Sequence, residues 1–534
     1  MNGSFPGRVL LSFAIGLFGV IAALQLIPFV RSSELPSVAA LPSVEDALAG
    51  LERPKPAGEF RVFTIGASLS QGFPYSPAYA ASYGKLMGDG LAGFVQAPRV
   101  VTRAIARPAL DSPKLVELVR RSLAWEPDLL IVTLGSNEYA NRLFSSKQLL
   151  PRSLLAQVDE RLGRARILWR ELPGHGRRWP APGPGDASAE KALAEKLVAR
   201  ALKAEPGKAQ LGALPFDRDE RELLLGRLRR SMQEIDALAR AAKVPLVYCQ
   251  AVYGLGAFWP WGHESGGQDA EIDRLALRFH LGEGEEVALE DLELEGEGRA
   301  DLAFMRGLVL RRLGRREEAL DEFRRARDLD PVPIHRTGPI DQVVQEEAKR
   351  LGRPLFDLNE PFCRLARDGI PGDEHFLDYG HLSASGHRIA AGYLARELAE
   401  RKLLPLAADF DRAAFDRAVR ASIAASISAD ELRYAWPRIA AANGNYGLLF
   451  GNFRDALPYL LRCFQELPMD QSNAQRLLFC LVHVAGRTGE FAQDDAEQAT
   501  ARSLRLYQEL LQARKEQRLQ DWVRSYLQAA PGKR

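Results

Sequence analysis

The chain has 534 residues, of which 46% are hydrophobic and 26% are charged. At about 100–200 residues per domain this length predicts two to four domains, and the ordinary composition excludes a disordered or fibrous chain. Lysine and arginine number 71 against 69 aspartate and glutamate, and the resulting net charge of +2 argues against a bulk nucleic-acid binder. Four cysteines exclude a scaffold built on disulfides.

The segment 9–30 is an uncharged run of 22 residues. As a helix it is about 33 Å long, enough to cross a bilayer core of about 30 Å, and it exceeds the apolar part of a signal peptide, about 7–15 residues. We therefore expect a transmembrane anchor at 9–30 and a proline-containing linker at 31–58, with cleavage at the small residues 37–40 as the alternative. Arg8 before the run, weighed against Arg31 and the acidic residues after it, favours a body on the extracytoplasmic, periplasmic side.

Five short apolar segments then alternate with helical patterns. The strands are expected at Phe60–Leu69, Arg99–Ile105, Asp128–Leu134, Val244–Val252 and Pro354–Leu358. Helical patterns cover Lys114–Ala124, Asp219–Ala242 and Ile340–Arg350. This alternation predicts βαβ units and a parallel five-stranded sheet, in an α/β domain at 59–405 with insertions at about 142–215 and 256–338.

The second insertion carries a repeat signature at 300–333 that matches the tetratricopeptide helix pair. The matching positions are Gly307, Leu310, Ala319, Phe323, Ala326 and Pro331. Small and apolar residues at these positions let two antiparallel helices pack closely. One such unit cannot bury its own face, so we expect neighbouring helices.

The C-terminal stretch 406–534 is rich in alanine and leucine and is expected to be helical. It holds a looser match to the same signature, because Gly447 stands where an apolar residue is expected. The matching positions are Gly444, Ala456, Leu460, Cys463 and Pro468. An ordinary helical cap and a repeat array with a binding groove both agree with this pattern.

Three of the expected strands end in residues that carry chemistry. Ser68 follows the first, at a strand-to-helix turn on the sheet edge where open α/β sheets bind ligands. The third is followed by Gly135, which lets the backbone approach closely, and by Asn137, whose amide can donate to a developing oxyanion. After the fifth, Asp378 and His381 are spaced so that the carboxylate holds the imidazole Nδ1–H and leaves Nε2 free as a base. Taken singly, each pattern is also typical of an ordinary turn or helix cap.

Together, the order Ser, then Gly and Asn, then Asp-x-x-His resembles the SGNH (GDSL-type) hydrolase superfamily, over about residues 57–400. The stretches GASLSQGFPY, EPDLLIVTLGSNEY, ARDLDP and IPGDEHFLDYGHLSASGH are similar to bacterial membrane-anchored members with tetratricopeptide repeats. The resemblance implies a flavodoxin-like three-layer α/β/α sandwich. It implies that Ser68 is the nucleophile, His381 the general base and Asp378 its orienting partner. Asn137 and the backbone N–H of Ser68 would form the oxyanion hole, with Gly135 supporting the turn.

Two positions depart from the family's pattern. Ala67 stands where an aspartate is usual between glycine and serine, which leaves the nucleophile in place but changes the hydrogen bonding of the turn. The segment 102–112, which should supply an oxyanion-hole glycine, has none. The backbone N–H of Ala106 or of Arg107 is the nearest candidate for this donor. Loss of one such donor typically costs about 10²–10³ in kcat, so a missing donor predicts a feeble enzyme.

These patterns predict a membrane-anchored serine esterase that acts through an acyl-enzyme on O-acyl groups of envelope glycans or lipids, without a metal or cofactor. Two alternatives stay open. An O-acyltransferase would use the same triad, with an acceptor hydroxyl in place of water. A membrane-tethered scaffold would instead combine a degraded hydrolase domain with helical repeats that bind protein partners. None of the three involves nucleic acid.

Overall fold

The computed structural model describes residues 44–75, 79–94, 99–139, 216–256, 259–260, 298–333, 336–406, 410–449, 453–466, 471–484 and 496–528. The expected anchor at 9–30, the first insertion at 142–215 and the segment 261–297 of the second insertion lie outside these residues. Within the described ranges, none of the helices combines the length and the apolar character that a membrane crossing needs.

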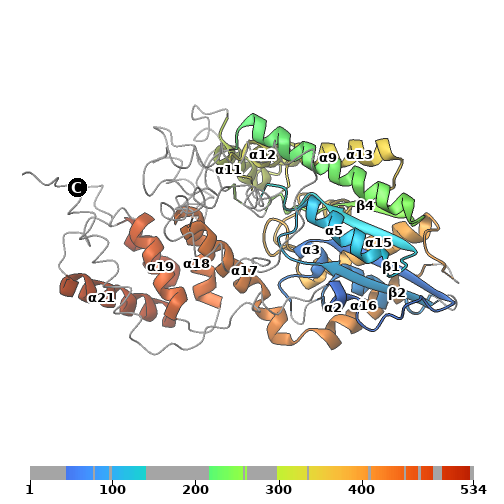
Figure 1. The fold of residues 1–534 in the computed structure, drawn as a ribbon. Helices are drawn as coiled ribbons and strands as arrows, with labels where there is room; N and C mark the ends of the chain where they lie inside the picture. Colours follow the sequence, from blue (N-terminus) through green and yellow to red (C-terminus); the bar gives the residue numbers. More distant parts are fainter. Residues whose placement is uncertain are drawn as a thin grey trace, which may run out of the picture. The chain divides into compact units, whose positions relative to one another are not determined.

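Five parallel strands form one sheet in the order β2-β1-β3-β4-β5 (Figure 1). The strands are β1 (Glu59–Gly66), β2 (Arg99–Ala106), β3 (Leu129–Leu134), β4 (Leu246–Gln250) and β5 (Leu355–Asp357). Every residue of β3 and β4 is buried, as expected for central strands that are covered on both faces. The prediction of an α/β domain with a parallel five-stranded sheet is confirmed.

Two of the expected strands are too long at their C-terminal ends. β1 stops at Gly66, and Ser68–Gln71 form the short helix α3. Leu69 continues the apolar pattern of β1 but belongs to α3. Gly72 ends this short helix in a left-handed conformation (φ 84). β4 ends at Gln250 rather than Val252, so the last apolar residues of that run begin a loop instead.

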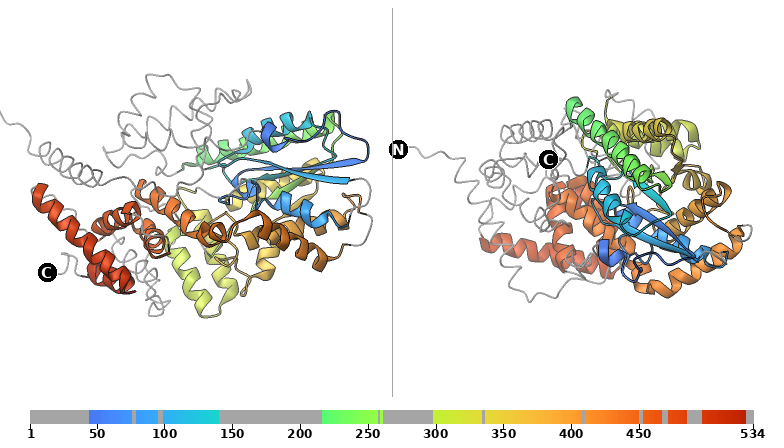
Figure 2. Two further views of the ribbon diagram at one scale, coloured as in Figure 1. Left: turned by 90° about the horizontal axis from the view of Figure 1, so that it is seen from below. Right: turned by 45° about the vertical axis from the view of Figure 1, so that its right-hand side comes forward.

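Helices cover both faces of the sheet (Figure 2). One face carries α5 (Ser112–Leu123), α9 (Arg218–Ala241) and α13 (Gly338–Leu351), and the other carries α4 (Tyr83–Leu91), α15 (Ala384–Glu400) and α16 (Arg412–Ser426). Successive strand side chains point to opposite faces. Phe63 and Leu130 therefore pack with the first group of helices, whereas Val62 and Leu129 pack with the second. The short helix α2 (Val44–Ala47) packs beside β2 and α5, and the short helix α14 (Glu360–Leu365) packs beside α15 with Phe362 in the second core.

The repeat signature of the second insertion folds as two helices, α11 (Ala300–Arg312) and α12 (Arg316–Leu329). Gly307 faces Phe323 so closely that a Cβ at position 307 would lie 2.9 Å from the ring. Ala319 is fully buried in the same pair of helices. Residues of the signature therefore make the contact between the two helices.

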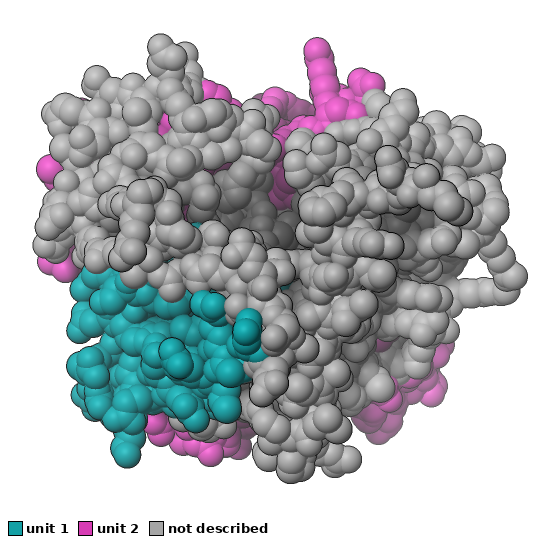
Figure 3. Space-filling model, turned by 90° about the vertical axis from the view of Figure 1, so that its left-hand side faces the viewer, with its two compact units in different colours: residues 1–35, 268–287, 437–534 teal, residues 36–267, 288–436 magenta. Residues whose placement is uncertain are grey.

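After residue 436 the described residues form a compact unit of their own (Figure 3). Its helices are α17 (Ala429–Leu449), which begins before the unit, α18 (Phe453–Glu466), α19 (Gln471–Val484), α21 (Ala496–Lys515) and α22 (Leu519–Gln528). Gly444 and Leu460 repeat the Gly307–Phe323 contact at the same spacing along the chain, since a Cβ at position 444 would lie 2.7 Å from Leu460 Cδ2. The helical character expected for the C-terminal stretch is present throughout its described part.

Among the described residues, the compact unit that contains the sheet extends to residue 436. α16 belongs to the α/β unit, because its Phe415 is fully buried against α4, where the ring leaves no room for a Cβ at Gly90. Composition does not mark this boundary. The alanine-rich pattern runs through 406–436 without a break, although one face of α16 packs on the domain core.

Candidate active site

Ser68 is the first residue of α3, at the turn that follows β1. The backbone N–H of Phe73 donates to the Ser68 carbonyl (3.1 Å), and that of Gln71 donates to the Ala67 carbonyl (3.1 Å). These bonds hold the turn, and Ser68 is 9% exposed at its edge. The Ala67 methyl is buried in the apolar core that also holds Leu110, so this chain has apolar packing where a carboxylate is usual in the family it resembles.

The loop after β5 places His381 and Asp378 together. The Leu377 N–H donates to the His381 carbonyl (2.7 Å), which closes the loop. Asp378 Oδ1 accepts hydrogen bonds from the backbone N–H groups of Gly380 (2.9 Å) and His381 (2.7 Å). Its other oxygen, Oδ2, lies 2.6 Å from His381 Nδ1. The loop therefore orients the carboxylate and the imidazole with respect to each other.

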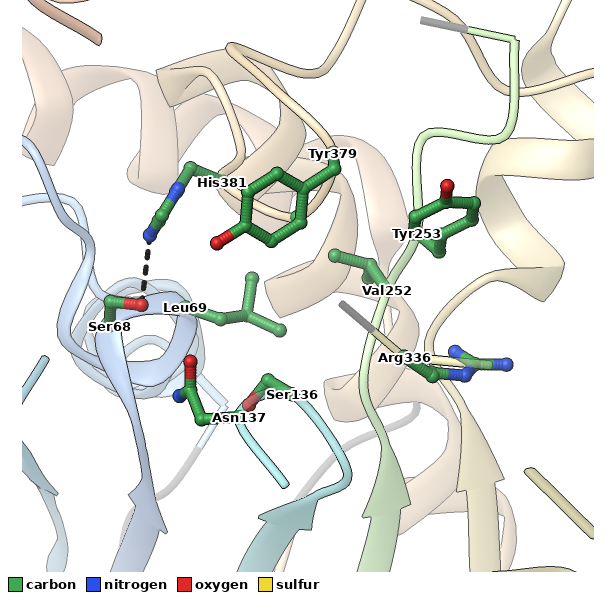
Figure 4. A pocket seen from close by; sticks show the side chains of 10 residues that line it. Ser68, Leu69, Ser136, Asn137, Val252, Tyr253, Arg336, Tyr379 and His381 are labelled. Atoms are coloured by element: carbon green, nitrogen blue, oxygen red, sulfur yellow. Dashed lines mark hydrogen bonds between the residues drawn. The ribbon is translucent and has the colours of Figure 1, made fainter. Parts of the chain in front are cut away.

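Ser68 Oγ lies 2.8 Å from His381 Nε2 (Figure 4). Because Asp378 occupies the Nδ1 side of the ring, Nε2 is free to accept the serine proton. The structure thus brings Ser68, His381 and Asp378 into one chain of hydrogen bonds. Such a chain can activate a serine hydroxyl as a nucleophile.

Asn137 lies beside Ser68 in the same pocket. It follows Gly135, whose left-handed conformation (φ 89) turns the chain at the end of β3. The Asn137 side-chain amide donates one hydrogen bond to the Leu110 carbonyl (3.1 Å). An amide nitrogen carries two hydrogens, so the same group has a second donor for a ligand oxygen.

The segment between β2 and α5 lacks the glycine expected there. Ala106 is the last residue of β2, its carbonyl accepts a hydrogen bond from Tyr79 Oη (2.7 Å), and neither Ala106 nor Arg107 lines the pocket. Ala109 instead takes a left-handed conformation (φ 56), which glycine adopts at far lower cost. It precedes Leu110, whose carbonyl holds Asn137. An alanine gives no sequence signal for this conformation, and the donor in this segment stays unassigned.

Glu138, the neighbour of Asn137, connects the turn after β3 to the start of α5. It is 2% exposed, and its carboxylate accepts hydrogen bonds from Ser112 Oγ (2.9 Å) and Ser112 N (3.1 Å). Burial and, after it, the negative charge of Asp111 raise the pKa of Glu138 to about 7, against the opposing effect of Arg227. No local pattern in the sequence marks Glu138 as part of the site.

The charge of Asp111 is balanced inside the same buried cluster. Although burial favours its neutral form, Lys114 (3.1 Å) and Arg227 (3.6 Å) hold the pKa of Asp111 below its ordinary value. Arg227 also donates to the Glu138 carbonyl (3.4 Å). The cluster ties the loop before α5 to the turn that carries Asn137.

The pocket beside Ser68 is built from five parts of the chain (Figure 4). Its lining residues are Ser68, Leu69, Ser136, Asn137, Val252, Tyr253, Arg336, Tyr379, Gly380 and His381. Among them, only Ser68, Asn137 and His381 are predicted site residues. Leu69, Ser136, Tyr379 and Gly380 are neighbours of these residues in the same motif segments. Val252, Tyr253 and Arg336 come from segments without a recognisable motif, and their nearness depends on the order of the strands in the sheet.

Two further histidines and a tryptophan lie outside this arrangement. His387 is fully buried against the rings of Tyr75 and Tyr83, and burial lowers its pKa to about 3, so it is neutral. His375 is half-buried near Ser385. Trp259 packs against Phe304 of α11, in agreement with a packing role.

Within the described ranges, no group of three or more His, Cys, Asp or Glu side chains comes together in a way that could hold a metal ion. In comparisons with known proteins, neither a family model nor a curated protein matched the chain. Any functional assignment therefore depends on the geometry of the residues described above.

Proposed function

We propose that this protein is a serine hydrolase of the SGNH (GDSL) type that cleaves ester bonds through an acyl-enzyme. The observation that carries the proposal is the continuous chain from Ser68 Oγ to His381 Nε2 (2.8 Å) and from His381 Nδ1 to Asp378 Oδ2 (2.6 Å). The position of this chain also supports it. Ser68 and Asn137 follow the carboxyl ends of β1 and β3, where open α/β sheets bind their ligands.

In the first half of the reaction, Ser68 Oγ attacks the ester carbonyl carbon while its proton passes to His381 Nε2. The C–O bond to the alcohol then breaks, and His381 returns the proton to the departing alkoxide. In the second half, water gives a proton to His381 and its oxygen attacks the acyl carbon. The Ser68 ester bond breaks, Ser68 recovers its proton and the acid is released.

The negative charge on the carbonyl oxygen needs donors that are already in place. The Ser68 backbone N–H and the second amide hydrogen of Asn137 are the proposed donors. The Asp111–Glu138 cluster keeps the Asn137 turn in contact with the loop before α5. In this proposal the Asn137 amide supplies a donor even though the segment 102–112 has no glycine.

The setting that we propose follows from the sequence. The uncharged run at 9–30 would anchor the protein, with the body on the extracytoplasmic side, and the substrates would be O-acyl groups of envelope glycans or lipids. An O-acyltransferase would share every step up to the acyl-enzyme. Product analysis with a sugar or glycerol acceptor separates it from a hydrolase, because only a transferase gives a new ester.

A scaffold is the second candidate function. The observation that favours it is the presence of two helix pairs that share the Gly307–Phe323 and Gly444–Leu460 type of contact. Such pairs are typical of repeats that bind partner proteins. In this alternative the Ser68–His381 chain would be a vestige without activity.

Reaction of the purified full-length protein with a fluorophosphonate probe decides between the two. We expect labelling of the wild type and loss of labelling in Ser68→Ala and in His381→Ala. His375→Ala is the matched control, because His375 lies in the same loop but outside the hydrogen-bonded chain. Thermal unfolding establishes that each variant is folded. A folded wild type that does not react would exclude the enzyme and leave the scaffold.

A further inference from the structure

The helix pair α11–α12 contacts two segments of chain that lead to the candidate site. One is the loop after β4, which carries Val252 and Tyr253 of the pocket (Figure 4). The other is the segment 367–374, which runs directly into the loop that holds Asp378 and His381. Of the described residues that line the pocket, none belongs to α11 or α12. Any effect of the helix pair on the site therefore acts through these two segments.

Arg311, in the last turn of α11, binds the segment 367–374. Its Nη2 donates to Asp368 Oδ1 (3.2 Å), and its Nε donates to Asp368 Oδ2. Asp368 Oδ1 also accepts a hydrogen bond from the N–H of Ile370 (3.1 Å), whose side chain is fully buried. Although burial favours the neutral acid, these donors hold the pKa of Asp368 below its ordinary value. Arg311 therefore binds a charged carboxylate that its own loop already orients.

The Arg311 guanidinium also lies against the loop after β4. A Cβ at Gly256 would lie 2.9 Å from Arg311 Nη1. The N–H of Gly256 donates to the Pro371 carbonyl (2.9 Å), so Arg311 stands where the two segments are hydrogen-bonded to each other. A second bond between them joins the Gly254 N–H to the carbonyl of Tyr379 (2.8 Å), the neighbour of Asp378. Movement at Arg311 is thus linked to the loop of the proposed base by a short path of backbone bonds.

Two further contacts connect the helix pair to the same segments. Arg316, the first residue of α12, lies over Gly369 and leaves no room there for a Cβ. Trp259, farther along the loop after β4, is 6% exposed and packs edge to face on Phe304 of α11, with ring centres 5.0 Å apart. Phe304 packs in turn on Phe323 of α12 (5.1 Å). Each segment therefore has contacts with the helix pair beyond Arg311 itself.

We propose that the helix pair α11–α12 is a working part of the active site, and that Arg311 is the positioning residue through which it holds the Asp378–His381 loop in place against Ser68. The inference rests on the proposed function, because it assumes that Ser68 and His381 react. Arg311 and Asp368 are 24% and 28% exposed, and an ion pair of this exposure adds little to stability. Its effect should appear in the rate instead, since a misplacement of about 1 Å can cost about 10²-fold.

Arg311→Gln tests the proposal on the full-length protein, with p-nitrophenyl acetate as a general ester probe. We expect kcat to fall by about 10–100-fold, because the base is no longer held at reacting distance. KM should stay close to the wild-type value, since Arg311 does not line the pocket. Titration of Ser68 with the fluorophosphonate probe counts the active sites, so a smaller folded fraction does not enter kcat.

Arg315→Gln is the matched control. It removes another arginine of the same helix pair, one whose partner is the exposed Glu318 of α12 rather than the segment 367–374. This variant should keep the kcat of the wild type. An unchanged kcat in Arg311→Gln, or an equal loss in Arg315→Gln, would overturn the assignment.

A double-variant cycle tests whether Arg311 acts through Asp368. Asp368→Asn should lower kcat as Arg311→Gln does, and the double variant should lose no more than either single variant, because the two side chains act as one unit. This non-additivity would not arise from two independent losses of stability. Losses that add up in the double variant contradict the positioning role.

The wild type keeps the two proposals separate. If the probe labels Ser68 in the wild type and Arg311→Gln retains full kcat, the positioning role falls and the serine hydrolase stands. If folded wild type reacts with neither the probe nor the ester, the proposed function falls, and the role of Arg311 falls with it.

Discussion

Asp378 accepts three hydrogen bonds, two from backbone N–H groups of its own loop and one from the His381 ring. It is 5% exposed, so the carboxylate is held by its partners more than by water. The backbone bonds fix its orientation, and that orientation in turn selects the His381 tautomer with the proton on Nδ1. At the scale of single residues, Asp378 thus decides whether Nε2 can act as a base.

Replacing Asp378 by Asn removes this selection while keeping the size of the side chain. For the proposed ester hydrolysis, we expect kcat to fall by about 10³–10⁴, because an amide can donate to Nδ1 and so favours the tautomer whose Nε2 carries the proton. Asp373→Asn is the control, since Asp373 is exposed in the same loop. A loss of less than tenfold with Asp378→Asn would contradict the role given to this carboxylate.

At the scale of elements, two helix pairs depend on glycines that leave no room for a side chain. Gly307 lies against the Phe323 ring and Gly444 lies against Leu460. The partner residue is fully buried in both pairs, so it has little freedom to give way. Close approach of helices at a small residue is what the repeat signature requires.

Substitution of Gly307 by Ala would place a Cβ 2.9 Å from the Phe323 ring. We expect a loss of about 1–3 kcal/mol from overpacking, seen as a lower thermal unfolding midpoint. Gly298→Ala should leave the midpoint nearly unchanged, because no atom lies within 4 Å of a Cβ built there. Equal midpoints for the two variants would show that the α11–α12 contact is looser than the structure indicates.

At the scale of the whole molecule, two fully buried groups make stability depend on pH in opposite directions. Burial lowers the pKa of His387 to about 3 from an ordinary 6.5. The folded state therefore loses stability as pH falls from 6.5 towards 3, because the unfolded chain binds this proton first. Burial raises the pKa of Glu138 to about 7 from 4.5, so its contribution is complete below pH 4.5 and is lost as pH rises through 7.

Glu138→Gln isolates the second effect. Gln cannot ionise, so the variant should lack the loss of stability that ionisation of Glu138 causes above pH 7, which amounts to about 3 kcal/mol at most. Urea unfolding at pH 5 and pH 8 measures the difference, and we expect the wild type to lose more stability over this interval than the variant does. Glu222→Gln, on the exposed face of α9, should behave as the wild type. A variant with the same pH dependence as the wild type would contradict the burial effect.

Much of the fold could be predicted because the central strands are continuous apolar runs such as 129–134, and only a sheet covered on both faces buries such runs. The end of β1 could not be predicted, because Leu69 belongs to the same apolar pattern as the strand. The turn is visible only in the structure, where Gly72 is left-handed. The position of α16 also escaped prediction, since the buried Phe415 is a single residue in a long alanine-rich stretch.

The candidate triad could be predicted because Ser68, Asp378 and His381 stand in recognisable local patterns. The residues that surround the triad could not be predicted in the same way. Val252 and Tyr253 belong to a loop that becomes part of the pocket only through the strand order. The Glu138–Ser112 bond joins residues that local patterns treat as a turn and a helix start, and the left-handed Ala109 looks like any other alanine. Long-range pairing and backbone strain leave no local trace in a sequence.

Ser68 and His381 are separated by 313 positions along the chain. The sheet grows outward from β1 in nearly the order of synthesis, with β5 added last at one edge. At about 5–20 residues per second, the ribosome needs about 15–60 s to add His381 after it has added Ser68. During biogenesis, any chemistry that needs the Ser68–His381 pair can therefore begin only when almost the entire α/β unit has been made.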